Sequence, residues 1–197
     1  MSASPIQRPR ETAPPASIER PPLVAVPSHP ALHLVAQEGQ LQVHTAPYRG
    51  SFSVVLSEAL RAAGLGRRVM VAQFLKGGVH QGPNGCIRLC GKLEWLRPDV
   101  SSCLSKPPHD DEHASKNVKA VEAIWKICQS RLIKGDLDQL VLDEVGLAIA
   151  LGYLKENEVL SSLEAKKGGM DVIITGPSIP SRVMAIADQV TELRRGF

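Results

Sequence analysis

A segment that could bind phosphate lies at residues 44–53, with the sequence HTAPYRGSFS. It follows an apolar run that ends at Val43 and precedes a helical pattern that starts at Val54. A glycine-bearing loop between a strand and a helix is the usual place for a phosphate-binding loop, whose backbone amides surround the phosphates. The segment therefore predicts a nucleotide-type site, but the lysine and the threonine that such a loop uses are absent.

Two more candidate binding positions follow apolar runs of strand length. Asp143 and Glu144 come after the run that ends at Leu142, and Gly176 comes after the run at residues 171–175. Ligands of open α/β sheets bind at the carboxyl ends of the strands, where carboxylates can hold Mg²⁺ or its water. The same acidic pair could instead cap a helix that starts at Val145, because acidic side chains favour a helix N-terminus. Both interpretations stay open.

The region between residues 80 and 113 holds residue types that bind zinc, namely Cys86, Cys90, Cys103, His80, His109 and His113. Cys86 and Cys90 span an expected strand, whose rise would separate their side chains by about 13 Å, too far for one ion. We expect no zinc, and we interpret the cysteines as buried or idle reduced thiols. The cluster His109 to His113 precedes a helix and is interpreted as a solvated cap.

The elements that position these residues alternate between strands and helices. Apolar runs of strand length occur at residues 32–45 (two strands with a turn at Glu38 and Gly39), 67–75, 86–99 (one or two strands with a turn at Gly91), 137–144, 170–176 and 190–193. Helical spacing occurs at residues 53–66, 118–132, 145–154, 156–167 and 178–190. The strand runs are nearly continuous, which predicts an α/β fold with a mostly parallel sheet and helices on both faces.

The first 30 residues differ in composition from the rest. They hold eight of the 15 prolines, mixed with Ser, Ala, Arg and Glu. Such a segment predicts a disordered tail, because it cannot bury enough apolar surface to fold. The tail could be a solubilising arm, or it could dock on a partner protein or a neighbouring subunit. The α/β domain is then expected to span residues 31–197.

Composition excludes some functional classes. Aromatic residues make up only 4% of the chain, and the basic residues behind the net charge of +3 are scattered, so we expect no nucleic acid as partner. No apolar stretch approaches the roughly 20 residues that span a bilayer, and no secretory signal precedes the domain. We therefore expect a cytoplasmic protein without a membrane partner.

Three segments resemble the ATP:corrinoid adenosyltransferases in order and spacing. They are ALRAAGLGRRVMVAQFLKGG at residues 59–78, LVLDEVGLAIALGYL at residues 140–154 and DVIITGPSIPSRVMAIADQVTELR at residues 171–194. The resemblance runs from about Leu41 to Leu193. It implies a P-loop fold, a homodimer, and transfer of the adenosyl group of ATP, with Mg²⁺, to a corrinoid substrate.

The loop departs from the pattern of this family, which reads TGNGKGKTT and would lie over residues 45–53. Pro47 has no amide hydrogen to donate, and Tyr48 replaces a glycine. Ser51 stands where the lysine should be, and Phe52 stands where the metal-binding hydroxyl should be. These departures predict a degenerate Walker A loop and make ATP and Mg²⁺ doubtful as cofactors.

Two functional classes follow. In the first, the protein is a non-catalytic descendant that binds a ligand or a partner. In the second, it is an active transferase in which Arg49 and Gly50 hold the phosphates, Ser53 or Asp143 orients Mg²⁺, and Glu144 assists as the catalytic residue. The resemblance implies a nucleotide-binding set of Thr45, Arg49, Gly50, Ser51, Ser53, Lys76 and Gly176. Lys76 could contact an anion there or be a solvated loop lysine.

Overall fold

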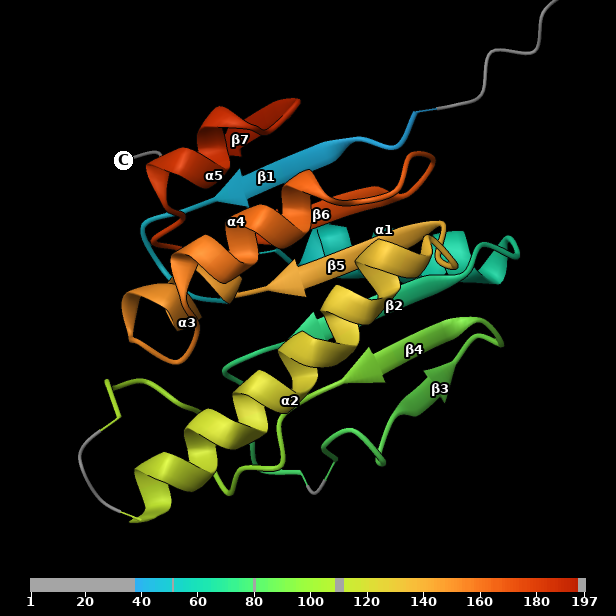
Figure 1. The fold of residues 1–197 in the computed structure, drawn as a ribbon. Coiled ribbons are helices and arrows are strands. Elements are labelled where there is room, and N and C mark those ends of the chain that lie inside the picture. Colours follow the sequence, from blue (N-terminus) through green and yellow to red (C-terminus); the bar gives the residue numbers. More distant parts are fainter. Residues whose placement is uncertain (1–37, 51, 80, 109–111, 195–197) are drawn as a thin grey trace, which may run out of the picture. The chain divides into compact units, whose positions relative to one another are not determined.

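The computed structural model describes residues 38–50, 52–79, 81–108 and 112–194. In this part of the chain the strands are β1 (Leu41–Thr45), β2 (Val69–Gln73), β3 (Ile87–Leu89), β4 (Leu93–Leu96), β5 (Gln139–Asp143), β6 (Asp171–Thr175) and β7 (Gln189–Glu192). The helices are α1 (Ser53–Gly64), α2 (Glu112–Lys134), α3 (Val145–Ala150), α4 (Glu156–Glu164) and α5 (Ser181–Ala185) (Figure 1). The expected disordered tail at residues 1–30 lies outside the described residues.

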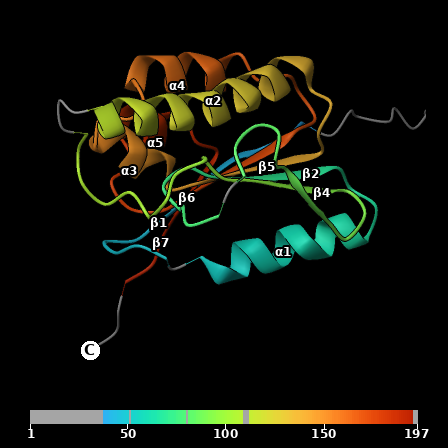
Figure 2. The ribbon, with the colours of Figure 1, turned by 90° about the horizontal axis from the view of Figure 1, so that it is seen from below.

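The described strands form one sheet in the order β3-β4-β2-β5-β6-β1-β7. All neighbouring strands run parallel except β3, which is antiparallel to β4 at one edge. Figure 2 shows α1 alone on one face of the sheet and the other four helices on the opposite face. The prediction of a mostly parallel sheet with helices on both faces is confirmed.

Alternation along the inner strands divides the core into two layers. Val69 and Val71 of β2 pack with α1, whereas Met70 and Ala72 point to the face that α2, α3, α4 and α5 cover. Every residue of β2 and β5 is buried, because helices lie over both faces. The described helices are too short or too polar for any of them to cross a lipid bilayer.

Helix α1 forms where the sequence predicts it and packs through small residues. Its buried positions are Val55, Ala59, Ala62 and Ala63, which recur at helical spacing. The last helical residue is Gly64, and the positive φ of 96° belongs to Gly66. The amide of Gly66 donates to the carbonyl of Ala63, and the next amide donates to the carbonyl of Ala62, so a Schellman motif ends the helix.

Two of the expected elements differ from the structure. Residues 38–40 belong to no turn or strand, and only the second of the two strands expected at residues 32–45 is described, as β1. A Cβ on Gly39 would lie 2.0 Å from the carbonyl oxygen of Met170, so this glycine permits a close backbone approach. The helix expected at residues 178–190 is only five residues long, because Asp188 leaves it to exchange hydrogen bonds with Leu41 of β1.

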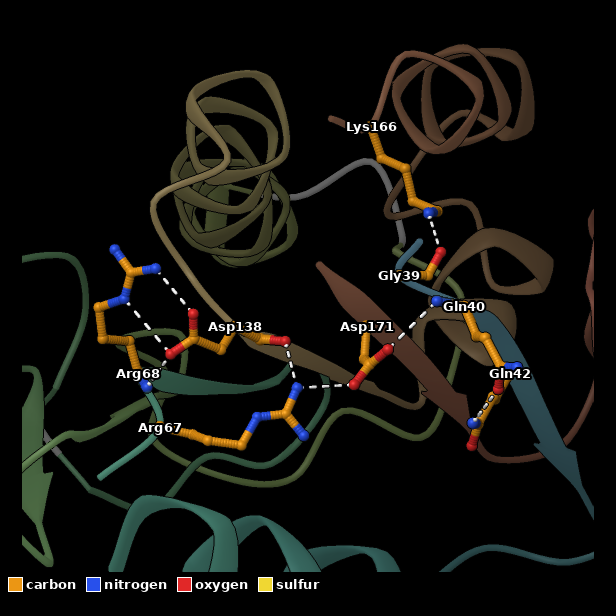
Figure 3. A network of polar contacts seen from close by, with 8 residues as sticks. All are labelled: Gly39, Gln40, Gln42, Arg67, Arg68, Asp138, Lys166 and Asp171. Carbon is orange, nitrogen blue, oxygen red and sulfur yellow. Dashed lines mark hydrogen bonds and ion pairs between the residues drawn. The ribbon is translucent and has the colours of Figure 1, made fainter. Parts of the chain in front are cut away.

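Ion pairs join the amino ends of the central strands (Figure 3). Asp138 precedes β5 and accepts hydrogen bonds of 2.7 Å from both the backbone amide and Nη2 of Arg68, which precedes β2. Arg67 donates from Nη2 to the carbonyl of Asp138 at 2.9 Å and to the carboxylate of Asp171, the first residue of β6, at 2.7 Å. These contacts join the amino ends of the neighbouring strands β2, β5 and β6.

The Asp138 carboxylate makes stability depend on pH. The hydrogen bonds from Arg68 lower the pKa of Asp138 from 3.8 to about 2. A carboxyl group whose pKa is lower in the folded state stabilises that state above its unfolded pKa, and this contribution disappears as the pH falls from about 4 to about 2. Because both side chains of the pair are partly exposed, we expect its contribution to be small.

Urea unfolding of the wild type and of Asp138→Asn at pH 5 and pH 2 tests this expectation. The variant should be the less stable protein at pH 5, and most of the difference should be lost at pH 2, where the folded-state carboxyl group is about half protonated. The other carboxyl groups titrate in both proteins, so their effect on stability cancels when the wild type and the variant are compared. A difference that stays constant between the two pH values would contradict the assigned role of Asp138.

Candidate functional site at the carboxyl edge of the sheet

The carboxyl ends of β2, β5, β6 and β1 lie next to one another, because these strands are neighbours and parallel. The register pairs Gln73 with Asp143, and Asp143 with Thr175. Laterally paired residues project to the same face of a sheet, so these three polar side chains meet. All three are buried, with at most 6% of their surface exposed.

The Asp143 carboxylate is hydrogen-bonded and charge-paired with its neighbours. It accepts 2.7 Å and 2.8 Å hydrogen bonds from Gln73 Nε2 and Thr175 Oγ1, and Lys76 Nζ lies 3.4 Å from Oδ2. A buried carboxylate needs both hydrogen bonds and an opposite charge, and this arrangement supplies them. Lys76 is therefore the counter-ion of Asp143, with 29% of its side chain exposed.

Gln73 extends the hydrogen-bonded chain towards the edge of the sheet. Its Oε1 accepts 2.9 Å and 2.8 Å hydrogen bonds from Trp95 Nε1 and Arg97 Nε, while its Nε2 donates to Asp143. Because its partners on one side are donors and its partner on the other side is an acceptor, the orientation of the amide is fixed. The chain links Trp95 of β4 to Thr175 of β6 through two buried side chains, Gln73 and Asp143.

The loop at residues 44–53 is joined by a bidentate ion pair to Glu144, the residue that follows β5. Arg49 Nε donates to Glu144 Oε1 at 2.8 Å and Arg49 Nη2 donates to Oε2 at 2.6 Å, while Nη1 donates to the carbonyl of Leu104 at 3.0 Å. The Glu144 side chain is 2% exposed and that of Arg49 is 32% exposed. The hydrogen bond to Glu144 is the main reason that the pKa of Arg49 lies above its usual value.

Backbone geometry presents the Glu144 carboxylate to the loop. Glu144 has a φ of 63°, in the left-handed region, and its amide donates to the carbonyl of Thr175 at 2.8 Å. A Cβ on Gly176 would lie 3.1 Å from Glu144 Cα, so a glycine is required beside it. Glu144 is the N-cap residue of α3, which begins at Val145 as expected, but its side chain makes no capping hydrogen bond to the helix.

Phe52 fills the start of α1 with an apolar ring. It is 7% exposed and belongs to the α1 side of the core with Ala46, Val55 and Ala59. Its ring meets the His44 ring edge-on, with 6.2 Å between the centroids. The place of a metal-binding hydroxyl is therefore occupied by a core side chain.

The other expected loop residues differ in their contacts and exposure. The carbonyl of Thr45 accepts a hydrogen bond from Leu193, Gly50 is exposed with a φ of 79°, and Ser53 is an exposed residue at the start of α1. Ser51 lies outside the described residues.

The residues present do not fit the Mg²⁺ ion of a phosphate-binding loop. Asp143 already has two hydrogen bonds and a lysine counter-ion, and Phe52 offers no oxygen. Within the described ranges, no three side chains of His, Cys, Asp or Glu are grouped to hold any metal. Cys86 and Cys90 do not share a strand face as expected, because β3 ends at Leu89 and Cys90 lies in the turn with a φ of 47°.

Sequence reasoning missed four groups of this site, namely Thr175, Trp95, Arg97 and the carbonyl of Leu104. A signal existed for Phe52, since it continues the apolar spacing of Val55 and Ala59 by one turn towards the N-terminus. No local pattern reveals the partner of Arg49, because Glu144 is 95 residues away along the chain.

Comparison with known proteins gives a consistent result. The family model described as ATP:corrinoid adenosyltransferase BtuR/CobO/CobP matches residues 37–196. The corrinoid adenosyltransferase CobA of Salmonella typhimurium is 32% identical over 158 residues, which cover 80% of this chain and 78% of that protein. The corrinoid adenosyltransferase of Escherichia coli K12 is 30% identical with the same coverage. That of Pseudomonas aeruginosa is 28% identical over 159 residues, or 80% and 75% of the two chains.

Proposed function

Because the chain belongs to the ATP:corrinoid adenosyltransferase family, we propose that it is a divergent member with lost or weakened ATP binding, which binds another ligand or a partner instead. The observation that carries this proposal is the bidentate pair between Arg49 and Glu144. Arg49 is the one cation in the loop segment at residues 44–53. Its guanidinium group is engaged with a carboxylate of the protein itself.

The energies favour the internal pair over a phosphate contact. A charge-assisted hydrogen bond to a phosphate contributes about 1.5–3 kcal/mol. If Arg49 left Glu144 to make that contact, a carboxylate that is 2% exposed would lose its partner. Breaking a buried pair in this way costs about 3–5 kcal/mol, which is more than the phosphate contact contributes. Other contacts to ATP would have to supply the difference.

Two further features support weakened binding. The ring of Phe52 is buried where the metal-binding hydroxyl of a Walker loop would lie. Asp143, the carboxylate that could hold the metal, is engaged by Gln73, Thr175 and Lys76. A triphosphate would therefore meet an arginine that is already paired with Glu144 and an Asp143 carboxylate that is already hydrogen-bonded.

We expect millimolar MgATP to leave the melting temperature of the full chain unchanged. A ligand that binds only the folded state adds about 2.7 kcal/mol of stability at a hundred times its dissociation constant, which a thermal melt detects. A clear rise in the wild type would contradict the proposal. If Arg49→Ala abolished such a rise, Arg49 would be identified as a phosphate ligand.

A variant with a rebuilt loop serves as the positive control. Ser51→Lys combined with Phe52→Thr restores the lysine and the hydroxyl of the family loop, so we expect it to gain a rise in melting temperature that depends on MgATP. Ser57→Lys adds the same charge at an exposed position of α1 and should gain none. A gain in both variants would show that added charge alone is responsible.

A second candidate function is an active transferase with a rearranged loop. It is favoured by the presence of Lys76, Asp143 and Glu144 together at the carboxyl edge, where sheets of this kind bind ligands. Incubation with ATP and a reduced corrinoid, followed by detection of a new cobalt–carbon bond, distinguishes the two functions. Turnover would establish the transferase, and absence of turnover together with absence of ATP binding would support the first proposal.

We also retain three proposals from the sequence, namely a homodimer, a partner that docks on residues 1–30, and action in the cytoplasm. Sedimentation at several concentrations tests the dimer. Capture of partners by the full chain and by a chain that starts at residue 31 tests the role of the tail. Identical partners for both chains would remove the tail from the proposal.

A further inference from the structure

A hollow lies on the α1 face of the sheet, at the edge formed by β3. Its volume is about 260 Å³, and its lining side chains are Val79, Gln81, Ile87, Leu89, Trp95 and Arg97. None of these lining residues comes from α1, although α1 is the helix on this face (Figure 2). The hollow is therefore the part of the face that the helix leaves uncovered.

The strand register explains why the walls of the hollow are apolar. Ile87 pairs with Trp95 and Leu89 pairs with Leu93, so all four side chains project to the α1 face. Leu93 is fully buried under α1, whereas Ile87 and Leu89 are 45% and 37% exposed. Val79 adds a third aliphatic side chain that is 39% exposed. Neighbouring exposed apolar residues of this kind mark a binding surface more often than isolated ones do.

Two polar side chains, Arg97 and Gln81, also line this hollow. Arg97 lies over the Trp95 ring, with 5.8 Å from its guanidinium carbon to the ring centroid, and donates from Nε to Gln73. In the described residues its two Nη groups have no acceptor. Gln81 Oε1 is buried and lacks a donor in the same part of the chain. The hollow thus combines an aromatic face, aliphatic walls and the guanidinium group of Arg97.

We propose that this hollow binds a small planar aromatic molecule that carries a carboxylate. The ring would lie against Trp95 and the aliphatic side chains, and the carboxylate would accept from the two Nη groups of Arg97. The volume is slightly below the usual range for ligand pockets, which limits the ligand to about two fused rings. A ring N–H or O–H group would in addition satisfy Gln81.

The hollow is connected to the strand-end site. Trp95 and Arg97, which line it, both donate to Gln73 Oε1, and Gln73 donates to Asp143. A bound carboxylate that accepts hydrogen bonds from Arg97 would therefore change the contacts of Gln73, which in turn donates to Asp143. This inference rests on the proposed function, because it names a ligand class for a family member in which ATP binding at the phosphate loop is lost or weakened.

Titration of the ¹⁵N-labelled full chain with 2-naphthoate tests the proposal. The chain has two tryptophans, and Trp125, which is 2% exposed, lies on α2 over the opposite face. We expect the Trp95 indole N–H signal to shift saturably while the Trp125 signal does not move. The neutral analogue 2-naphthalenemethanol should bind at least about tenfold more weakly, because it lacks the charge-assisted hydrogen bonds.

Variants separate binding in the hollow from general attraction of anions. Arg97→Met keeps the aliphatic stem and should weaken naphthoate about tenfold without affecting the neutral analogue. Arg88→Met is the matched control, since Arg88 lies on the same strand pair but projects to the other face beside Glu94. Val79→Trp places a large side chain over the hollow from an exposed position and should abolish binding of both compounds.

Three results would overturn the inference. They are the absence of a saturable Trp95 shift, equal affinity for the charged and neutral compounds, and equal weakening by Arg97→Met and Arg88→Met. If Arg97→Met fails to fold, the Val79→Trp variant still tests whether the compounds bind in the hollow, because it changes an exposed residue. A parallel titration with MgATP tests the proposed function separately, so failure of one proposal is distinguishable from failure of the other.

Discussion

Replacement of Arg49 by methionine is expected to lower the free energy of unfolding by about 3 kcal/mol. The cause is the Glu144 carboxylate, which is 2% exposed and would be left without its bidentate partner. Methionine preserves most of the aliphatic stem, so the loss reports on the charge and its hydrogen bonds. Urea unfolding followed by circular dichroism measures the change.

Removal of both charges, of Arg49 and Glu144, should destabilise the protein less than removal of the Arg49 charge alone. Glu144→Gln leaves Arg49, whose side chain is 32% exposed, able to reach water, so its effect should be smaller than that of Arg49→Met. The double variant should be more stable than Arg49→Met alone, since no unpaired buried charge remains. Arg68→Met, which breaks an exposed pair, is the matched control and should cause a smaller loss. A double variant as unstable as the sum of the single variants would argue against this account.

Gln73→Met is expected to cost about 2–4 kcal/mol in the free energy of unfolding, because the side chains around Gln73 each lose a hydrogen bond. The Trp95 indole N–H loses its acceptor, and the Asp143 carboxylate loses one of its donors. Methionine has a similar volume, so a cavity contributes little. Thermal or urea unfolding measures the loss.

Gln189→Met, a change at an exposed glutamine of β7, is the control and should be nearly neutral. Gln73→Glu gives a second measurement with a distinct signature. It would place a second carboxyl group against Asp143, and the pKa of this pair would be raised relative to the unfolded chain. The folded variant then binds more protons than the unfolded one, so its stability should increase as the pH falls from 7 to 5. A stability that decreases over that range would contradict the geometry.

Much of the fold is predictable because its signals are local. The apolar spacing of Val121, Ile124, Cys128 and Leu132 predicts α2, and these residues are all fully buried there. The continuous apolar runs predict inner strands, and β2 and β5 are buried throughout. Both signals depend only on the period of burial along the chain.

The site is less predictable because its partners are distant in sequence. An arginine fork binds a carboxylate as well as it binds a phosphate, so the residue type of Arg49 does not reveal that Glu144 is its partner. The length of α5 is a similar case, because a tertiary contact between Asp188 and Leu41 overrides a helical pattern. Such contacts appear only when the sheet order is known.

The position of β1 has a consequence for how the protein is synthesised. On a ribosome β1 emerges before every other described strand, yet its neighbours in the sheet, β6 and β7, emerge last. The block β3-β4-β2-β5 can pair earlier, whereas β1 must close a loop of more than a hundred residues before it gains a partner. Until then its apolar residues stay exposed to chaperones and to other nascent chains, and release of the carboxyl-terminal strands allows β1 to enter the sheet.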